Sequence, residues 1–427
     1  MQTRESHKTP HLAISNTGPL NHLEKQILNK EQEIEEWFEK EWEKSPAPIY
    51  GSVDLRNSGF KIAPVDMNLF PAGFNNLNKE FLPISIDAAK KSILSHAPNT
   101  KKILIVSESH TRNLFYWDSI KAILQILTKA GFEVRVGSLL EETIEIPCKE
   151  GGAVTVEPVK RITSRVALTD FDPDFVLLNN DLSDGIPKIF TDLDQEILPP
   201  AELGWSARLK SDHFQFYQAI ANEFAEKIEI DPWLIAPLFR RCNKIDFKAK
   251  SGVQCIEKNT DLLLKAIQEK YDKYNIDCKP FVIIKADSGT YGMAVMTVRD
   301  VAEVSSLNRK KRSAMSKSKG GKPVESVILQ EGVYTFETFG KENAIAEPVV
   351  YLWGERVVGG FYRVHKGRGK DENLNAPGMY FEPLAFATTC DDPKVSAPPD
   401  KSQNRFYVFG VIARLSMLAA AREMNKV

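Results

Sequence analysis

A strand–helix–strand pattern at residues 101–138 constrains the fold of this chain more than any other sequence feature. KKILIVSES is a short apolar run that ends in small polar residues. NLFYWDSIKAILQILTKAG has helical periodicity and ends at a glycine, and FEVRVGSL has the pattern of a second strand. Because strands joined by a helix lie parallel in one sheet, the pattern predicts an α/β fold with a parallel sheet.

Polar residues follow two of the predicted parallel strands. Ser109 and Arg112 follow the first strand, and Asn180 and Asp181 follow a later one, DFVLLNN. Ligands of open α/β sheets bind beyond the carboxyl ends of the strands, so we expect these side chains to share a site. The alternative is that they cap helices and close turns.

The stretch 46–78 is rich in Gly, Pro, Asn and Asp, yet it carries apolar residues throughout. The first group favours turns, and the second indicates an ordered loop. An ordered polar loop is a suitable surface for a small molecule. Its candidate contacts are Asp54, Arg56, Asp66, Asn68, Asn75 and Asn76. The alternative is that such side chains bond to their own backbone.

The strand PFVIIKA places Lys285 directly before a loop of small residues, and a second strand follows at 294–298. Glycine lets backbone N–H groups approach an oxyanion, and lysine adds a positive charge for a polyphosphate. Neither a Walker A pattern nor GxGxxG after a strand occurs in the chain. We interpret the segment as a hairpin over a triphosphate, with an ordinary hairpin turn as the alternative. The loop residues are Asp287, Ser288, Gly289, Thr290, Tyr291, Gly292 and Met293.

Two further segments add weaker signals. The strand VILQEGV runs into Gln330 and Glu331, which suits backbone pairing with the edge of an adenine ring. Arg363 suits the charge of a transferring phosphoryl group. Oxygen side chains of the type that Mg²⁺ prefers recur in the same region, at Glu347, Asn375 and Glu382. Structural strand ends and a solvated arginine are the alternatives.

Charge and composition exclude several classes of protein. Lys and Arg total 56 against 57 Asp and Glu, which argues against binding nucleic acid or an anionic membrane over the whole surface. The basic segment 309–322 lacks interleaved aromatics, so we interpret it as a solvated loop or a lid over ATP. The chain has no apolar run long enough to span a membrane, no signal-peptide pattern and five cysteines without CxxC. We therefore expect a cytoplasmic protein.

In type and order, these parts resemble the ATP-grasp superfamily. Six segments are similar to the proteobacterial class of glutamate–cysteine ligases: VDLRNSGFKIAPVDMNLFPAGFNNL, ILIVSESHTRNLFYW, LLNNDLSDGIP, GWSARLKSDHF, IIKADSGTYGM and NLNAPGMYFEPLA. The resemblance covers roughly residues 48–425 and implies a fold like that of glutathione synthetase. The implied divisions are an N-terminal extension at 1–45, a substrate domain at 46–230, and an ATP-grasp domain at 231–427 with a lid-like hairpin at about 280–335.

The resemblance implies a reaction. ATP phosphorylates the γ-carboxylate of glutamate, and the amine of cysteine attacks the acyl phosphate to give γ-glutamylcysteine, in the first step of glutathione biosynthesis. Lys285 and the loop 287–293 would hold phosphates, and Arg363 would steady the transferring group. The nucleotide hinge would comprise Gln330, Glu331 and Val333, and the Mg²⁺ ligands Glu347, Asn375 and Glu382.

The substrate contacts follow from charge. Arg56 and Arg112 suit carboxylates, because a guanidinium forks onto two oxygens. Asp54, Asp66 or Asp181 suits an ammonium group. The late segment departs from the superfamily's Glu-x-Asn metal pattern.

The alternative functions are a ligase with another amine acceptor and a catalytically silent nucleotide-binding protein. Whether the chain forms a homo-oligomer is left open.

Overall fold

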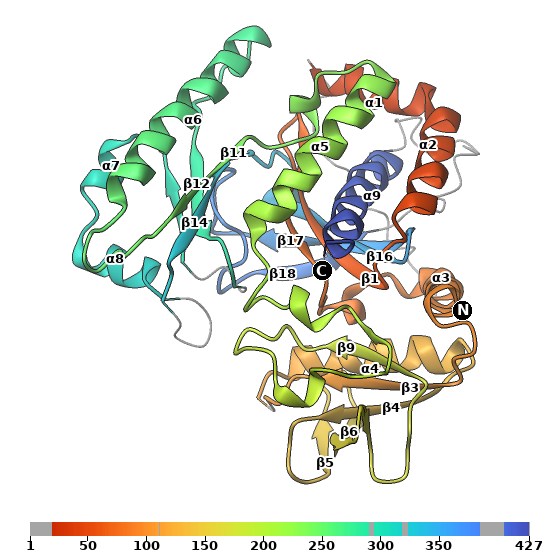
Figure 1. Cartoon of the computed structure of the whole chain (residues 1–427). Coiled ribbons are helices and arrows are strands. Elements are labelled where there is room, and N and C mark those ends of the chain that lie inside the picture. The colour runs from red at the N-terminus through yellow and green to blue at the C-terminus, as the bar shows by residue number, and fades with distance from the viewer. Residues whose placement is uncertain (1–18, 111, 290–293, 318–322, 385–404, 427) are drawn as a thin grey trace.

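Three sheets of four or more strands organise the chain, and the computed structural model describes residues 19–110, 112–289, 294–317, 323–384 and 405–426. In Figure 1 a parallel sheet lies at the bottom, a central antiparallel sheet above it, and a smaller antiparallel sheet at upper left. This architecture confirms the predicted α/β class and its N-terminal parallel sheet.

The parallel sheet contains the predicted strand–helix–strand unit. Its strand order is β10-β9-β3-β4-β6-β5, and all neighbours are parallel except β5 and β6. Both faces are buried: Ile103 and Ile105 pack in one core cluster with Trp117, and Leu104 and Val106 in the other. The elements are α3 (Leu82–His96), β3 (Lys102–Ser107), α4 (Leu114–Lys129), β4 (Glu133–Ser138), β5 (Ile144–Pro147), β6 (Ala153–Pro158), β9 (Phe175–Asn179) and β10 (Ile197–Leu198).

The central sheet has the order β18-β17-β16-β1-β2, and β15 pairs with β16. Alternate residues give it two different faces. Val53, Leu55 and Met67 pack in the core with the apolar helix α9. The opposite face carries the charged Asp54, Glu347 and Arg363 at one end, and Val349 and Tyr351 of the second core cluster further along. The elements are β1 (Tyr50–Asn57), β2 (Ile62–Asn68), β15 (Thr338–Phe339), β16 (Ala344–Trp353), β17 (Arg356–His365), β18 (Tyr380–Pro383) and α9 (Arg405–Met424).

The expectation of an ordered loop over 46–78 is wrong for most of that stretch. β1 and β2 form an antiparallel pair there, with a register shift between Asp54 and Leu55. Only short 3₁₀ turns, η1 (Phe74–Asn76) and η2 (Lys79–Phe81), follow β2 before α3. Three of the polar residues in this stretch, Asp54, Arg56 and Asp66, lie on the two strands and are paired with oppositely charged side chains.

The smaller sheet, here called the lid sheet, has the order β11-β14-β12-β13 and is antiparallel throughout. The predicted hairpin at 280–298 is confirmed, because Val282 pairs with Val298. One face packs on α6. The elements are β11 (Phe239–Asn243), α6 (Val253–Lys273), β12 (Val282–Ala286), β13 (Val295–Val298), α7 (Ala302–Ser305), α8 (Arg309–Met315) and β14 (Ser326–Glu331).

The basic segment is partly helical rather than a loop. The side chain of Asn308 accepts a hydrogen bond from the backbone N–H of Lys311 and so caps α8. Residues 318–322 lie outside the described residues. The remaining elements are α1 (Pro19–Asn29), α2 (Glu31–Lys44), β7 (Lys160–Ile162), β8 (Arg165–Ala167), η3 (Lys188–Phe190), η4 (Ala201–Leu203), α5 (Lys210–Ile228) and η5 (Pro232–Leu234).

The central sheet takes strands from both sides of residue 230, where the sequence analysis placed a domain boundary. The division into domains stays a prediction. Among the described residues, none of the helices has the length and apolar character needed to cross a membrane.

Candidate active site

Two arginines and two carboxylates form a buried network on the polar face of the central sheet. Arg363 Nη1 donates to Glu347 Oε1 at 2.6 Å and to Asp54 Oδ2 at 2.9 Å. Arg56 Nε donates to Glu347 Oε2 at 2.9 Å. The four formal charges cancel, so each charge of this arginine–carboxylate network has a partner away from water. The Nε atom of Arg363 has no hydrogen-bond partner within the described part of the chain and stays available to a ligand.

The network shifts the pKa values of its members. Burial raises the pKa of Asp54 above its usual value, and the neighbouring Arg363 only partly opposes this. Burial by itself would lower the pKa of Arg363. The neighbouring carboxylates of Asp54 and Glu347 outweigh burial, so the pKa lies above its usual value. Arg363 therefore remains a fixed positive charge at every pH of interest.

A second cluster, here called the lysine cluster, joins the central sheet to the lid sheet through Asp66, Lys210 and Lys285. Lys210 Nζ lies 2.8 and 2.9 Å from the two carboxylate oxygens of Asp66. Lys285 Nζ, from β12 of the lid sheet, donates to the backbone oxygen of Val65 at 2.6 Å. The predicted phosphate lysine thus reaches β2 of the central sheet, next to the arginine–carboxylate network.

Burial lowers the pKa of Lys285 to about 8, although the carboxylate of Asp66 partly opposes the shift. Burial alone would raise the pKa of Asp66, but Lys210 and Lys285 outweigh it and lower that pKa to about 2. At pH 7, one carboxylate therefore faces two ammonium groups.

Asp287 holds the start of α5 against the lid sheet. Its carboxylate accepts hydrogen bonds from Ser211 N at 2.8 Å and Ser211 Oγ at 2.7 Å, and it pairs with Arg241 Nε at 2.9 Å. Its backbone oxygen accepts from Lys210 N at 2.7 Å. Asp287 therefore positions Lys210 beside the lysine cluster.

The predicted hinge residues divide between the two faces of the lid sheet. Gln330 is opposite Ile283 in the register, and Lys285 is opposite Ile328, so Gln330 and Lys285 share a face. The buried Nε2 atom of Gln330 has no hydrogen-bond partner among the residues described. An unpaired buried amide is costly, so this atom is suited to a ligand on that face.

Glu331 faces the other way and anchors the lid sheet. Its carboxylate pairs with Lys61 Nζ at 2.9 Å and accepts from Trp233 Nε1 at 3.0 Å. Burial lowers the pKa of Lys61 to about 8, while Glu331 partly restores it. The backbone oxygen of Val333 accepts from Arg56 Nη1 at 3.1 Å, so the hinge is attached to the arginine–carboxylate network.

The profile of a known family, GshA: Glutamate-cysteine ligase, matches residues 24–424. The chain belongs to the glutamate–cysteine ligase family. This membership confirms the resemblance found in the sequence and the enzyme class that it implies, the first step of glutathione biosynthesis.

One solved structure of high similarity agrees with membership in the glutamate–cysteine ligase family. A crystal structure from Methylobacillus flagellatus KT, assigned as a γ-glutamylcysteine synthetase, is 50% identical with a TM-score of 0.90, covering 98% of this chain and 99% of that one. D-alanyl-alanine synthetase A from Vibrio cholerae O1 biovar eltor str. N16961 is 10% identical with a TM-score of 0.33, and the match covers 74% of this chain and 81% of that one. The search of curated proteins found no match.

The strand-exit residues of this glutamate–cysteine ligase family member lie mostly in turns. Asn180 Oδ1 accepts from Leu182 N at 3.0 Å, and Asp181 Oδ1 accepts from Ser183 N at 3.0 Å. Asn68 Oδ1 accepts from Phe70 N at 2.9 Å in the same way. In these three cases the structure favours the turn-closing alternative. Ser109 is half-buried and Arg112 is exposed.

Asn75 and Asn76 lie together in η1, where Asn75 Nδ2 donates to Asn76 Oδ1 at 3.3 Å. The Oδ1 atom of Asn75 is buried and has no hydrogen-bond partner in the described ranges. Of the small-residue loop, Ser288 and Gly289 follow Asp287, whereas Thr290, Tyr291, Gly292 and Met293 lie outside the described residues.

The predicted Mg²⁺ ligands do not come together. Glu347 is opposite Arg363 in the strand register, whereas Glu382 is opposite Tyr362, so these two carboxylates lie on opposite faces of the central sheet. Asn375 sits in a turn, where its N–H donates to Asn373 Oδ1 at 2.9 Å. Over the described ranges, no group of three or more His, Cys, Asp or Glu is placed to hold a metal ion.

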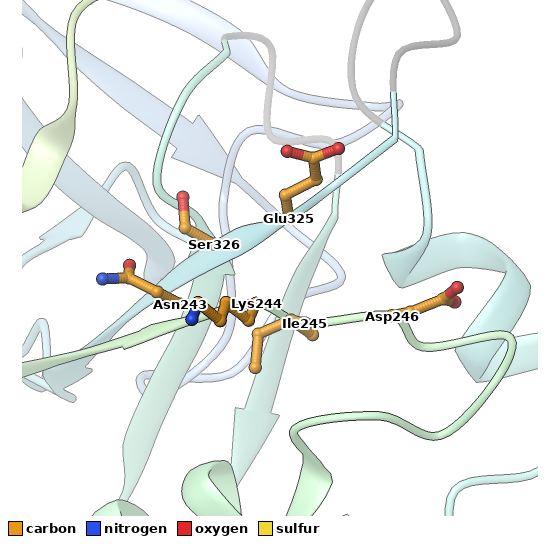
Figure 2. A pocket seen from close by; sticks show the side chains of 6 residues that line it. All are labelled: Asn243, Lys244, Ile245, Asp246, Glu325 and Ser326. Carbon is orange, nitrogen blue, oxygen red and sulfur yellow. The ribbon is translucent and has the colours of Figure 1, made fainter.

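A pocket of about 440 Å³ opens where β11 ends and β14 begins, away from the hinge (Figure 2). It borders the small-residue loop, because Asp287 N donates to Ser326 O at 3.1 Å. Its charges are mixed, and none of the predicted site residues lines it. The lining residues are Asn243, Lys244, Ile245, Asp246, Glu325 and Ser326.

Sequence reasoning missed Lys210 and Trp205 as site residues. Lys210 Nζ lies 3.9 Å from the ring centroid of Trp205, and both side chains are buried. A signal was present, since both belong to the family-like segment GWSARLKSDHF. That segment entered the sequence analysis only for its resemblance to the family.

Proposed function

We propose that this chain joins the γ-carboxylate of L-glutamate to the amine of L-cysteine through an acyl phosphate formed with ATP. Membership in the glutamate–cysteine ligase family over residues 24–424 is the observation that carries the proposal. The contact of Lys285 with β2 supports it, because it sets a lid lysine beside two buried arginines. Phosphoryl transfer depends mainly on such positioned positive charge.

The nucleotide is assigned to the lid-sheet face that carries Lys285 and Gln330. Lys285 would hold a phosphate, and its ammonium charge is present at pH 7 because its pKa is about 8. The unpartnered Gln330 Nε2 and the backbone after it would meet the base. A lid sheet facing a central sheet across one site is the ATP-grasp arrangement that the sequence resembles.

The glutamate side chain is assigned to the space beside the arginine–carboxylate network. Arg363 carries an unused Nε donor there, and its fixed charge suits the oxygens of a phosphorylated carboxylate. Arg56 holds Glu347 and the Val333 backbone, which keeps the Arg363 guanidinium in place. Arg112 is exposed and would meet substrate only at the rim.

Mg²⁺ is expected for ATP chemistry, but the predicted ligands do not fit a preformed site, since Glu347 is paired with two arginines and Glu382 lies on the opposite face. No step is assigned to an ion held by these side chains. When bound to ATP, Mg²⁺ neutralises phosphate charge. The residues of this chain then orient the γ-phosphate towards the substrate carboxylate.

We propose a cytoplasmic location because of the state of the cysteines. Cys148, Cys242, Cys255 and Cys278 are free thiols, which suits a reducing compartment. No further partner is proposed beyond glutamate, cysteine and ATP.

Oxygen transfer tests the acyl phosphate. In the proposed route, a γ-carboxylate oxygen of glutamate bonds to the γ-phosphorus of ATP and leaves with phosphate when the cysteine amine attacks the carbonyl. Glutamate labelled with ¹⁸O in that carboxylate is expected to give phosphate carrying one ¹⁸O per turnover. Unlabelled phosphate formed together with the dipeptide would contradict the route. Replacing cysteine with another amine distinguishes this activity from that of a ligase with a different acceptor. If no amine supports turnover, the protein is a catalytically silent nucleotide-binding protein.

A further inference from the structure

We propose that Lys210 and the indole N–H of Trp205 bind a carboxylate of the glutamate substrate. This inference rests on the proposed function and adds a subsite to it. Both residues belong to the segment 204–214, which connects the parallel sheet to α5 and which the proposed chemistry leaves without a role.

The first observation is an unsatisfied donor. Trp205 is 3% exposed, and its Nε1 atom has no hydrogen-bond partner among the residues that the structure describes. A buried indole N–H normally has an acceptor, because leaving it unpaired costs about 1–3 kcal/mol. A bound carboxylate oxygen would supply that acceptor.

The second observation is an excess of positive charge at the same place. Lys210 Nζ lies 3.9 Å from the Trp205 ring centroid and contacts both oxygens of Asp66. An ammonium group has three donors, so one remains after Asp66 is satisfied. Asp66 also faces Lys285, which leaves two cations against one anion.

Two further carboxylates, Asp54 and Asp287, act on Lys285, and each of them is itself paired with an arginine, Arg363 and Arg241 respectively. Arg208, which also lies near the Trp205 ring, is paired with Glu423 at 2.8 Å. The arginine–carboxylate network is neutral by itself. Counted by ion pairs, the lysine cluster keeps one more cation than anion, which suits an anionic ligand.

The position of the segment favours an amino-acid carboxylate over a nucleotide phosphate. Trp205 N donates to Asp181 O at 2.8 Å, which holds the backbone of Trp205 just beyond the carboxyl end of β9 in the parallel sheet. Lys285, by contrast, comes from the lid sheet. Lys210 thus lies between the lid lysine and the parallel strand ends, where the carboxylate of a small substrate is expected.

The test compares two tryptophans. Trp205→Phe removes the indole N–H and keeps a ring beneath Lys210. The matched control is Trp353→Phe, because Trp353 Nε1 is likewise buried without a hydrogen-bond partner in the described part of the chain, but in a core cluster with Tyr50 and Phe74. Steady-state phosphate release gives KM for glutamate, cysteine and ATP, and calorimetry gives glutamate affinity without turnover.

Trp205→Phe is expected to raise the glutamate KM and Kd about tenfold to a hundredfold, the loss of one hydrogen bond to a charged group. The KM for cysteine and ATP should change less than twofold, and Trp353→Phe should leave all three unchanged. Lys210→Met should weaken glutamate binding in the same way, and Lys210→Arg should restore part of it. If Trp205→Phe does not fold, the glutamate affinity of the Lys210 variants tests the subsite instead.

Three results would overturn the subsite: unchanged glutamate affinity in both variants, an equal loss in Trp353→Phe, or a change confined to cysteine or ATP. An inactive wild-type protein refutes the proposed function instead. In that case the calorimetric comparison of wild type with Trp205→Phe still decides whether glutamate binds at this indole.

Discussion

Replacing Lys285 with alanine removes the lid cation that the proposed mechanism places on a phosphate of ATP. The fold should tolerate the change, because the lost contact is one hydrogen bond to Val65 O and Asp66 keeps its pair with Lys210. Loss of one preorganised electrostatic donor costs about 2.7–4 kcal/mol of transition-state stabilisation. We therefore expect kcat to fall about 10²–10³-fold with little change in melting temperature.

The assay is phosphate release from ATP with saturating glutamate and cysteine, together with thermal unfolding of each variant. Lys244→Ala is the matched control, since Lys244 is an exposed lysine that directly follows β11 of the lid sheet and lines the pocket outside the predicted site. Lys285→Arg should retain more activity than Lys285→Ala, because it keeps the charge. A Lys285→Ala variant with nearly wild-type kcat would refute the reasoning.

Three further predictions follow from the charged clusters. Because the pKa of Lys285 is about 8, its charge is lost as pH rises through that value, so log(kcat/KM) for ATP should fall with a slope of about −1 above pH 8; a profile flat to pH 9.5 would oppose this. Lys61→Met leaves the buried carboxylate of Glu331 without its cation, so urea unfolding should show a loss of about 3–5 kcal/mol, and a loss below 1 kcal/mol would contradict the anchoring role. Arg56→Ala should raise the glutamate KM more than the exposed Arg112→Ala does, as measured by phosphate release, and the reverse order would move the substrate to the rim of the parallel sheet.

Local patterns predicted the elements whose signal lies within one segment. The strand–helix–strand unit at 101–138 and the hairpin at 280–298 each close on themselves, so periodicity and glycines were sufficient. The strands of the stretch 46–78 escape prediction because β2 pairs only with β1, and β1 in turn pairs with a strand distant in the sequence. β1 pairs with β16, and this pairing makes Asp54 and Arg56 inward-facing residues rather than loop residues.

The candidate site shows the same limit. Lys285 and Arg363 could be predicted because each residue type is informative on a strand, and Lys285 reaches β2 of the sheet that carries Arg363. The register that puts Glu347 and Glu382 on opposite faces depends on the pairing of β16, β17 and β18, which one sequence does not contain. Lys210 was missed because its role depends on Asp66, 144 residues away.

The central claim is that one site on this chain consumes ATP to join glutamate to cysteine. The most direct measurement is phosphate release from ATP and Mg²⁺ with glutamate, with and without cysteine, combined with mass detection of the product. The account predicts cysteine-dependent release and a dipeptide that resists α-peptidases, as a γ-linkage requires. Absence of both phosphate release and dipeptide with glutamate and cysteine would contradict it.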